Sequence, residues 1–304
     1  MKTVISYLKG VPNTKNQEKI EVLNRFIEGV NAVGDRGTAY NYPKWTASDV
    51  AVIQGYVHEK SPNRSHLKLR RNVLDKQAAY GKRTVIIDSN LFLYADPGNT
   101  KHYLRYSLDG VFPTTGNYFW DNPDPERWKS ISKNLNLSLK DWRTSGDHVL
   151  ICLQRNGGWS MQGLDVMDWC KQVITTIEAK TDRPIVVRAH PGDKDAFRYL
   201  NLEHPRVKIS FTPSILDDLK NAWATITYNS SPGVASAIEG VPVFVTDPNP
   251  QISQAYDIAN TDLSLLENPA MPDRQQWIEK ISMCHWNFEE LSSGEAWKHI
   301  RKYV

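Results

Sequence analysis

The sequence predicts an α/β protein made of two Rossmann-like domains that face each other across a cleft. Strand-like and helical runs alternate in both halves of the chain. The strand-like runs are continuously apolar, as in parallel sheets that are covered on both faces. The length of 304 residues exceeds that of one ordinary domain. We therefore expect domains at 1–145 and 146–304, with the last helix of the chain able to pack back on the first domain.

The first half reads as three strands and two helices. Continuous apolar, β-branched runs indicate the strands, and apolar residues at helical spacing, ended by a glycine, indicate the helices. In chain order these are a strand over 3–8, a helix over 19–34, a strand over 50–57, a helix over 67–81 and a strand over 84–92. The segment 95–146 is rich in Asn, Asp, Gly and Pro, and predicts a long functional loop.

The second half has a cleaner rhythm of strands and helices. Its apolar runs are short and β-branched, and each is followed by a turn signal or a helical pattern. We expect strands over 148–154, 184–190, 207–211, 224–229 and 241–246, and helices over 165–181, 214–222, 231–240, 274–286 and 295–304. No internal repeat is present, so the alternation indicates a parallel sheet with helices on both faces.

Composition indicates a globular, cytoplasmic protein. Hydrophobic residues make up 40% and charged residues 23% of the chain, and the three cysteines lack metal-binding spacing. No apolar stretch approaches the length of a membrane span or a signal peptide, and no metal site is indicated.

Charge is distributed unevenly along the chain. Residues 1–150 hold 22 Lys+Arg and 15 Asp+Glu, which gives +7, and the remaining residues hold 15 and 19, which gives −4. The densest basic run lies over 64–76. A basic half suggests a polyanionic partner, although a solvated helix face is the favoured explanation of any single run of this size.

Ligands of open parallel sheets bind beyond the carboxyl ends of the strands, so the residues there are the candidates. The strand over 148–154 is followed by Arg155, Gly157 and Gly158, which suit either an anion or an ordinary turn. The stretch RPIVVRAHPGD carries Arg188 and His190 at the next strand end. Arg188 is a fixed cation and His190 a proton or hydrogen-bond donor for a phosphate; a satisfied strand-edge histidine is the alternative.

The stretch TYNSSPGVASAIEG is the strongest local pattern. A strand leads into Asn229, Ser230 and Ser231, and a proline then opens a helix. Hydroxyls and amides at a helix start can hold a phosphate, or one serine can simply cap the helix. Glu239, at the end of this helix, is a candidate for a ribose or sugar hydroxyl or a solvated residue.

The RAHP strand end and the later SS turn together resemble the HP and SS motifs of GT-B glycosyltransferases, in particular those related to bacterial sialyltransferases and capsule Kdo transferases. The resemblance covers about 145–304. It implies that His190, Ser230 and Ser231 hold the phosphate and nucleotide of a UDP- or CMP-type nucleotide sugar. Many such enzymes place a Glu near the start of the last donor-site helix, where this chain has Ala235 and Ser236. Glu239 is the expected substitute.

The first half resembles glycosyltransferases by which phages modify hydroxymethylated bases of their DNA. The resemblance lies in IDSNLF, YSLDGVF and DNPDPERWKSI. Together with the basic first half, it implies a DNA acceptor carrying hydroxymethylcytosine or hydroxymethyluracil.

Metal-independent transfer with inversion needs a base for the acceptor hydroxyl. Asp88, at the end of a strand, is the candidate, with Asp96 and His66 in reserve. A hydrogen-bonded turn is the alternative for Asp88. Asp193 and Asp195 form a DxD pattern, which we expect to cap a helix and not to bind a metal.

Aromatic side chains of the long segment are the candidate acceptor contacts, because a flipped base stacks on such rings. Packing of the loop by its own aromatics is the alternative. They are Tyr103, Tyr106, Tyr118, Phe119 and Trp120.

Three functions stay open from the sequence. They are a phage-type DNA glycosyltransferase, a capsule or lipopolysaccharide glycan transferase of the same fold, and a non-catalytic nucleotide- or DNA-binding protein. A sugar-nucleotide epimerase would share the fold. The sugar, the nucleotide, the stereochemistry and the oligomeric state are not encoded in any pattern.

Overall fold

The computed structural model describes residues 1–12, 17–59, 61–112 and 123–304. They form two compact units. Unit 1 comprises Met1–Leu135 and Glu279–Val304, and unit 2 comprises Asn136–Ile278. The boundary thus lies ten residues before the predicted 145/146, because the amides of Lys140 and Arg143 donate to carbonyls of unit 2.

Unit 1 contains a mixed sheet of six strands within the described residues, in the order β11-β5-β4-β3-β1-β2. Strands β1 to β4 run parallel, and β5 and β11 add to one edge in antiparallel pairs. The bounds are Thr3–Tyr7 for β1, Arg36–Tyr40 for β2, Val50–Gln54 for β3, Arg83–Asp88 for β4, Leu104–Leu108 for β5 and His285–Trp286 for β11. The central strands β3 and β4 read as continuous apolar runs because both of their faces are buried.

Helices of unit 1 bury one apolar stripe each. In α1, Val22, Phe26 and Val30 recur at helical spacing and are fully or almost fully buried. The helices are α1 over Gln17–Ala32, α2 over Ser65–Ala79, α3 over Pro125–Leu135, α9 over Phe288–Ser292 and α10 over Glu295–Ile300, with the short η1 over Leu8–Gly10 and η6 over Arg301–Tyr303.

The segment predicted as one long loop, 95–146, contains part of the core. Strand β5 and helix α3 both fall within it. Tyr106 in β5 is fully buried and stacks on Phe26, with ring centroids 6.2 Å apart. The loop prediction is therefore wrong over these two elements.

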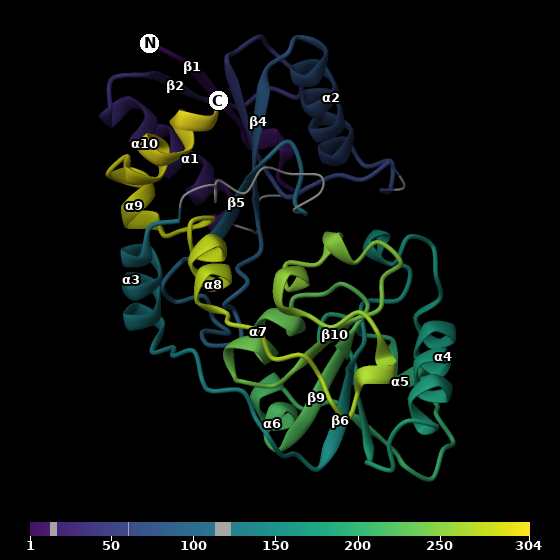
Figure 1. The fold of residues 1–304 in the computed structure, drawn as a ribbon. Helices are drawn as coiled ribbons and strands as arrows, with labels where there is room; N and C mark the ends of the chain where they lie inside the picture. Colours follow the sequence, from purple (N-terminus) through teal and green to yellow (C-terminus); the bar gives the residue numbers. More distant parts are fainter. Residues whose placement is uncertain (13–16, 60, 113–122) are drawn as a thin grey trace. The chain divides into compact units, whose positions relative to one another are not determined.

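The C-terminal segment packs on α1 inside unit 1 (Figure 1). Trp297 in α10 is 1% exposed and its Nε1–H donates to Asp35 at 2.9 Å. Gly29 lets α9 approach, since a Cβ there would lie 1.9 Å from the carbonyl oxygen of Leu291. The helix predicted over 274–286 ends at Ser282, and His285–Trp286 form strand β11.

Unit 2 contains a parallel sheet of five strands within the described residues, in the order β10-β9-β6-β7-β8 (Figure 1). The strands are β6 over His148–Cys152, β7 over Ile185–Arg188, β8 over Val207–Ser210, β9 over Ala222–Thr227 and β10 over Val243–Val245. The helices are α4 over Val166–Glu178, α5 over Ala196–Tyr199, α6 over Ile215–Leu219 and α7 over Pro232–Ile238, with η2 over Trp159–Met161, η3 over Pro250–Ile252, η4 over Tyr256–Ile258 and η5 over Leu263–Leu265. Helix α8, Gln275–Ser282, crosses the boundary between the units.

The sheet of unit 2 is parallel and that of unit 1 is mainly parallel, and both have crossover helices, which confirms the α/β prediction. The strands of β6 and β9 are buried along most of their length, as their apolar sequences indicate. Within the described part of the chain, no helix is both long and apolar enough to cross a bilayer.

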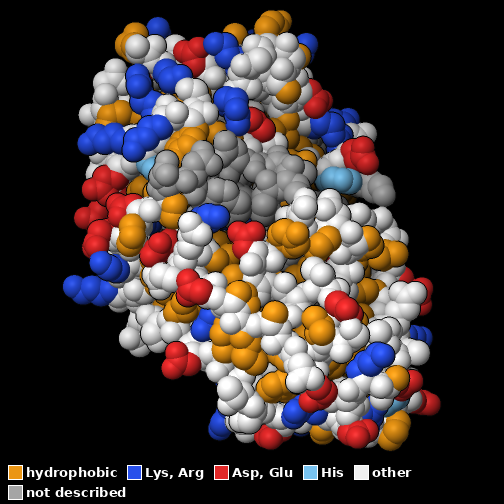
Figure 2. Space-filling model, in the orientation of Figure 1, with side chains coloured by type: hydrophobic (Ala, Val, Ile, Leu, Met, Phe, Trp, Pro, Cys, Tyr) orange, Lys and Arg blue, Asp and Glu red, His pale blue; other side chains and the backbone are white. Residues whose placement is uncertain are grey.

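The uneven charge follows the units. Unit 1 holds 24 Lys+Arg and 17 Asp+Glu, or +7, and unit 2 holds 13 and 17, or −4, which together give the +3 of the chain. Figure 2 shows Lys and Arg side chains at several places over the elements of unit 1.

Candidate functional site

The loops after β6 and β7 meet at the carboxyl edge of the unit 2 sheet. The amide of Asn156 donates to Asp193 at 2.9 Å. Arg155 lies against Gly192, because a Cβ at Gly192 would be 2.6 Å from its Nη2. Arg155 itself is exposed, so its charge is available to a ligand. These contacts place Arg155 beside His190, so the structure brings these two predicted site residues together.

His190 is held as a hydrogen-bond donor. The Gly192 amide donates to its Nδ1 at 3.0 Å, which places the proton of the neutral ring on Nε2. Burial lowers the pKa of His190, and Arg155 and Arg188 lower it further, against the opposing effect of Asp193. A neutral ring with Nε2–H can donate a hydrogen bond to a phosphate oxygen without first gaining a proton.

The glycine pair after β6 forms a turn. The amide of Gly158 donates to the carbonyl of Arg155 at 3.0 Å, and the amide of Gly157 donates to the side chain of Asn156 at 3.0 Å. Gly157 has φ 66°, and a Cβ at Gly158 would lie 2.9 Å from the Arg155 carbonyl. Both glycines are thus needed to shape the loop that presents Arg155, and their amides are already engaged.

Asn229 holds the loops together through its buried side chain. Its Nδ2 donates to Asp247 at 2.7 Å and to the Ser160 carbonyl at 3.1 Å, while its amide donates to Gln154 at 3.1 Å. The Asn229 side chain therefore positions the loops, and its contact with a nucleotide stays a prediction. Sequence reasoning missed Gln154 and Asp247, whose signal was that each lies two residues beyond the end of a strand.

The two serines differ from each other. The Ser230 hydroxyl oxygen is buried and has no hydrogen-bond partner within the described residues. Ser231 is exposed at the N-cap of α7, and its side chain makes no capping hydrogen bond there to a described residue. Simple capping therefore accounts for neither hydroxyl, and exposed Ser231 is the one that a ligand can reach directly.

The amides of the α7 start are less available than the sequence suggests. The Gly233 amide donates to the Ser230 carbonyl at 3.1 Å and the Val234 amide to the Ser231 carbonyl at 2.9 Å. Pro232 has no N–H. The amides of Gly233 and Val234 are therefore engaged within the turn, and the two serines remain the candidate ligand contacts.

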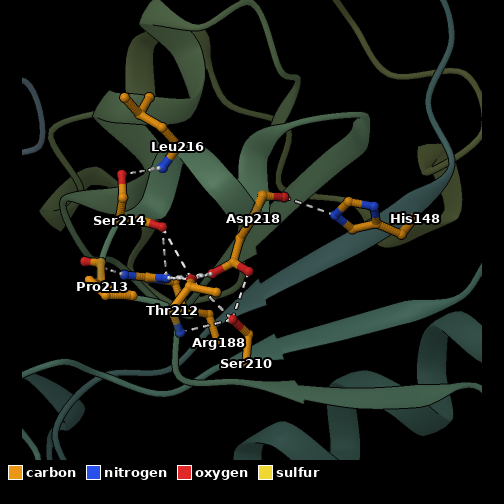
Figure 3. A network of polar contacts seen from close by, with 8 residues as sticks. All are labelled: His148, Arg188, Ser210, Thr212, Pro213, Ser214, Leu216 and Asp218. Atoms are coloured by element: carbon orange, nitrogen blue, oxygen red, sulfur yellow. Dashed lines mark hydrogen bonds and ion pairs between the residues drawn. The ribbon is translucent and has the colours of Figure 1, made fainter.

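Arg188 does not point to the strand-end loops. Figure 3 shows its guanidinium within a network of α6 and the β8 end. Nη1 contacts the carboxylate of Asp218 and donates to Thr212 Oγ1 at 2.8 Å, and Nη2 donates to the Pro213 carbonyl at 3.4 Å. The Asp218 carboxylate also accepts from Ser210 at 2.7 Å.

This network gives Arg188 a structural role. Its side chain is 6% exposed and that of Asp218 is 7% exposed. A buried ion pair whose remaining atoms are hydrogen-bonded joins β7, β8 and α6. The predicted phosphate contact of Arg188 is corrected accordingly.

Glu239 lies near the amino ends of the unit 2 strands, opposite the carboxyl ends that carry the other candidate residues. Helix α7 has 7 residues and so runs about 10 Å away from the strand ends where it begins. Arg143 contacts both the carbonyl of Gly240, next to Glu239, and that of Ala222, the first residue of β9. Glu239 itself is paired with Lys140. The predicted sugar contact of Glu239 is therefore wrong.

Asp88 ends β4 at the carboxyl edge of the unit 1 sheet. Its carboxylate accepts from the Ser89 amide at 2.7 Å and lies 3.4 Å from Arg105 Nη2, and its side chain is 29% exposed. The partial exposure leaves an oxygen accessible to a ligand proton. Its role as a base stays a prediction.

The two reserve bases have different surroundings. Asp96 accepts from the Thr100 hydroxyl at 3.0 Å and the Lys101 amide at 2.9 Å, and despite opposing burial these bonds lower its pKa. Burial lowers the pKa of His66, helped by the nearby cations Arg70, Arg64 and Lys19. Asp96 is thus a turn residue, and His66 is a neutral ring in a cationic setting.

The aromatic acceptor contacts fall into two groups. Tyr103 and Tyr106 are 0% exposed and belong to the core, so they pack within the fold, as the alternative expects, and do not stack on an acceptor. Tyr118, Phe119 and Trp120 lie outside the described residues.

The DxD pattern serves loop geometry. Asp193 accepts from the amides of Asn156 and Asp195, and Asp195 pairs with Arg198 at 3.1 Å. Asp195 is at the N-cap of α5 but makes no side-chain capping bond to a described residue, so the capping prediction is wrong for it. No cluster of three potential metal ligands occurs among the residues that the structure describes.

The comparisons with known proteins yield matches among solved structures. No protein-family model matches the chain, and no curated protein does. The chain is similar to the β-Kdo 2,4 transferase of Thermosulfurimonas dismutans KpsC, with 14% identity, a TM-score of 0.57 and coverage of 92% of this chain and 89% of that chain. It is also similar to the β-Kdo 2,7 transferase of the same KpsC, with 12% identity, a TM-score of 0.51 and coverage of 99% and 100%.

At identities this low, the structural likeness establishes a shared fold. Both halves of the chain are covered, so the likeness extends beyond the second half in which the sequence motifs occur. The chain therefore has a GT-B type of architecture, with two α/β units.

Proposed function

We propose that the protein transfers a sugar from a nucleotide-sugar donor to a hydroxyl acceptor. The observation that carries this proposal is the group of Arg155, His190, Ser230 and Ser231 on three adjacent strands at one sheet edge. It combines an exposed cation, a neutral histidine whose proton lies on Nε2, and hydroxyls without partners among the described residues. Groups of this kind suit the phosphates of a nucleotide.

In the proposed reaction, the bond between the sugar carbon and the donor phosphate breaks as the acceptor oxygen attacks. Negative charge then grows on the leaving phosphate. Arg155 stabilises this charge electrostatically and His190 donates a hydrogen bond to it. The donor is a UDP- or CMP-type nucleotide sugar, and no metal or other cofactor is required.

The acceptor hydroxyl must lose its proton in an inverting displacement. Asp88 is the proposed base, since its carboxylate is partly exposed at a strand end.

The acceptor we put first is a hydroxymethylated pyrimidine in phage DNA, modified in the cytoplasm of the host. The net charge of +7 on unit 1 supports this choice, because polyanions bind to basic surfaces. The second candidate is a capsule or lipopolysaccharide glycan, which is favoured by the likeness to two Kdo transferases.

Nucleotide release from a panel of UDP- and CMP-sugars tests the function. Each donor is incubated with no acceptor, with hydroxymethylcytosine or hydroxymethyluracil DNA, and with glycan acceptors. We expect release that depends on one donor and on modified DNA, with a matching mass gain on the base.

The other results separate the alternatives. Release that depends on a glycan would select the second acceptor, and release of free sugar or an epimer without any acceptor would indicate an epimerase. Silence with every donor, together with retained nucleotide or DNA binding, would refute the enzymatic proposal in favour of a binding protein.

A further inference from the structure

Unit 1 contains a buried arginine whose charge lacks a carboxylate partner among the described residues. Arg70, on α2, is 6% exposed. Its Nε–H donates to the Gly10 carbonyl at 2.7 Å, and this is its one hydrogen bond within the described part of the chain. Its terminal nitrogens are not among the fully buried unpaired atoms, so they keep contact with solvent.

Two strand-end glycines make room for Arg70 at the carboxyl edge of the sheet. Gly10 follows β1, and a Cβ there would lie 3.6 Å from Arg70 Cγ. Gly55 follows β3, has φ 85°, and would place a Cβ 2.6 Å from Arg70 Nη1. The guanidinium therefore lies against the backbone of two loops at the edge where parallel sheets bind ligands.

The surroundings of Arg70 add positive charge. Burial lowers the pKa of Arg70 to about 10, and Asp88 opposes this shift. Burial also lowers the pKa of Lys19 and of His66, and the charge of Arg70 lowers both further. Asp88 is itself 3.4 Å from Arg105, so it does not neutralise the group.

A buried cation without a counter-ion is costly, and an anion that enters would lower that cost. A guanidinium suits an oxyanion because its paired N–H groups match two oxygens. The partial exposure of Lys19 and His66 leaves a route for such a group from solvent.

We propose that Arg70, supported by Lys19 and His66, binds an oxyanion of the acceptor. The assignment of this oxyanion to the acceptor rests on the proposed function, whereas the existence of an anion site at Arg70 does not. The +7 charge of unit 1 favours a phosphodiester of DNA, because a basic surface suits a chain of repeated charges.

Binding of the full-length protein to a fluorescent hydroxymethylcytosine oligonucleotide tests the proposal. Arg70→Met keeps the aliphatic stem and removes the charge. We expect Kd to rise about tenfold, the size of one lost charge-assisted contact. The slope of log Kd against log salt should fall by about 0.7–0.9, as for one phosphate contact.

A glycine pair supplies a second variant with a matched control. Gly55→Ala drives a Cβ into the guanidinium, whereas Gly34→Ala has the same φ of 85° and no heavy atom within 4 Å of the new Cβ. Backbone strain is thus alike in the two variants. We expect weaker oligonucleotide binding in the first and wild-type binding in the second, and Lys68→Met, an exposed change on α2, should change Kd less than twofold.

Melting temperature and donor-dependent nucleotide release are measured for every variant. Wild-type binding by folded Arg70→Met would overturn the anion site, whether or not its melting temperature changes. Arg70-dependent binding of a uronate oligosaccharide, without such dependence for the oligonucleotide, would overturn the choice of phosphodiester. Arg70-dependent DNA binding in a protein that releases no nucleotide would support the anion site and refute the proposed enzyme.

Discussion

Replacing Arg188 by Met separates a structural role from a donor-binding role. The change would leave the Asp218 carboxylate, which is 7% exposed, with the hydroxyls of Ser210 at 2.7 Å and Thr212 at 2.9 Å but no cation. Removing one partner of such a buried pair costs about 3–5 kcal/mol. For a unit of this size that corresponds to a fall in melting temperature of about 10 °C.

The assay is thermal unfolding of wild type, Arg188→Met, Asp218→Asn and the double variant. We expect the cycle to give a coupling free energy of about 2 kcal/mol or more, because the two groups are in direct contact. Arg198→Met is the control, since the side chains of its pair with Asp195 are 70% and 67% exposed. It should change stability by less than about 0.5 kcal/mol.

An Arg188→Met variant that unfolds like wild type and instead raises the donor KM would refute the structural role of Arg188. That result would mean that the guanidinium leaves the network of Figure 3 to bind a phosphate.

Four further predictions concern other parts of the molecule. In nucleotide-release assays, we expect His190→Ala to lower kcat about 100-fold. We expect Arg155→Met to raise the donor KM about tenfold in the same assays. Matching losses of melting temperature in these variants would contradict roles of the two residues in binding and chemistry. Gly29→Ala should destabilise unit 1 by about 3 kcal/mol in urea unfolding, since its Cβ would lie 1.9 Å from the Leu291 carbonyl, and an unchanged midpoint would refute this. Burial lowers the pKa of His285 to about 3, so the folded ring stays neutral while the unfolded ring gains a proton below about pH 6.5. Stability should therefore fall as pH decreases below that value, by up to about 1.4 kcal/mol per pH unit; an NMR titration midpoint of His285 above pH 5 would be incompatible with this.

The fold was predictable wherever burial leaves a local pattern. The continuous apolar runs of β3, β4, β6 and β9 lie in sheet centres, and helix α4 shows its apolar stripe in the sequence. Strand β2 is largely exposed at an edge, and β5 includes the buried polar residues Arg105 and Ser107. Neither carries an apolar run, so only tertiary pairing identifies them as strands.

The site was predictable as far as its loops. Strand ends located Arg155, His190 and the two serines, because the carboxyl edge follows from strand direction alone. The direction of Arg188 depends on Asp218, 30 residues later in the chain. The place of Glu239 depends on the length of α7, and the availability of the Gly233 and Val234 amides depends on hydrogen bonds within the turn that starts this helix. No single-sequence pattern contains these relations.

The return of the C-terminal segment to unit 1 sets an order for folding during synthesis. Unit 2, over Asn136–Ile278, is one continuous stretch and is complete before residues 279–304 leave the ribosome. Unit 1 begins first but must wait for Trp297, which is 1% exposed in its core. Until then the apolar face of α1 lacks its cover, so the nascent N-terminal stretch is the part of the chain most in need of a chaperone.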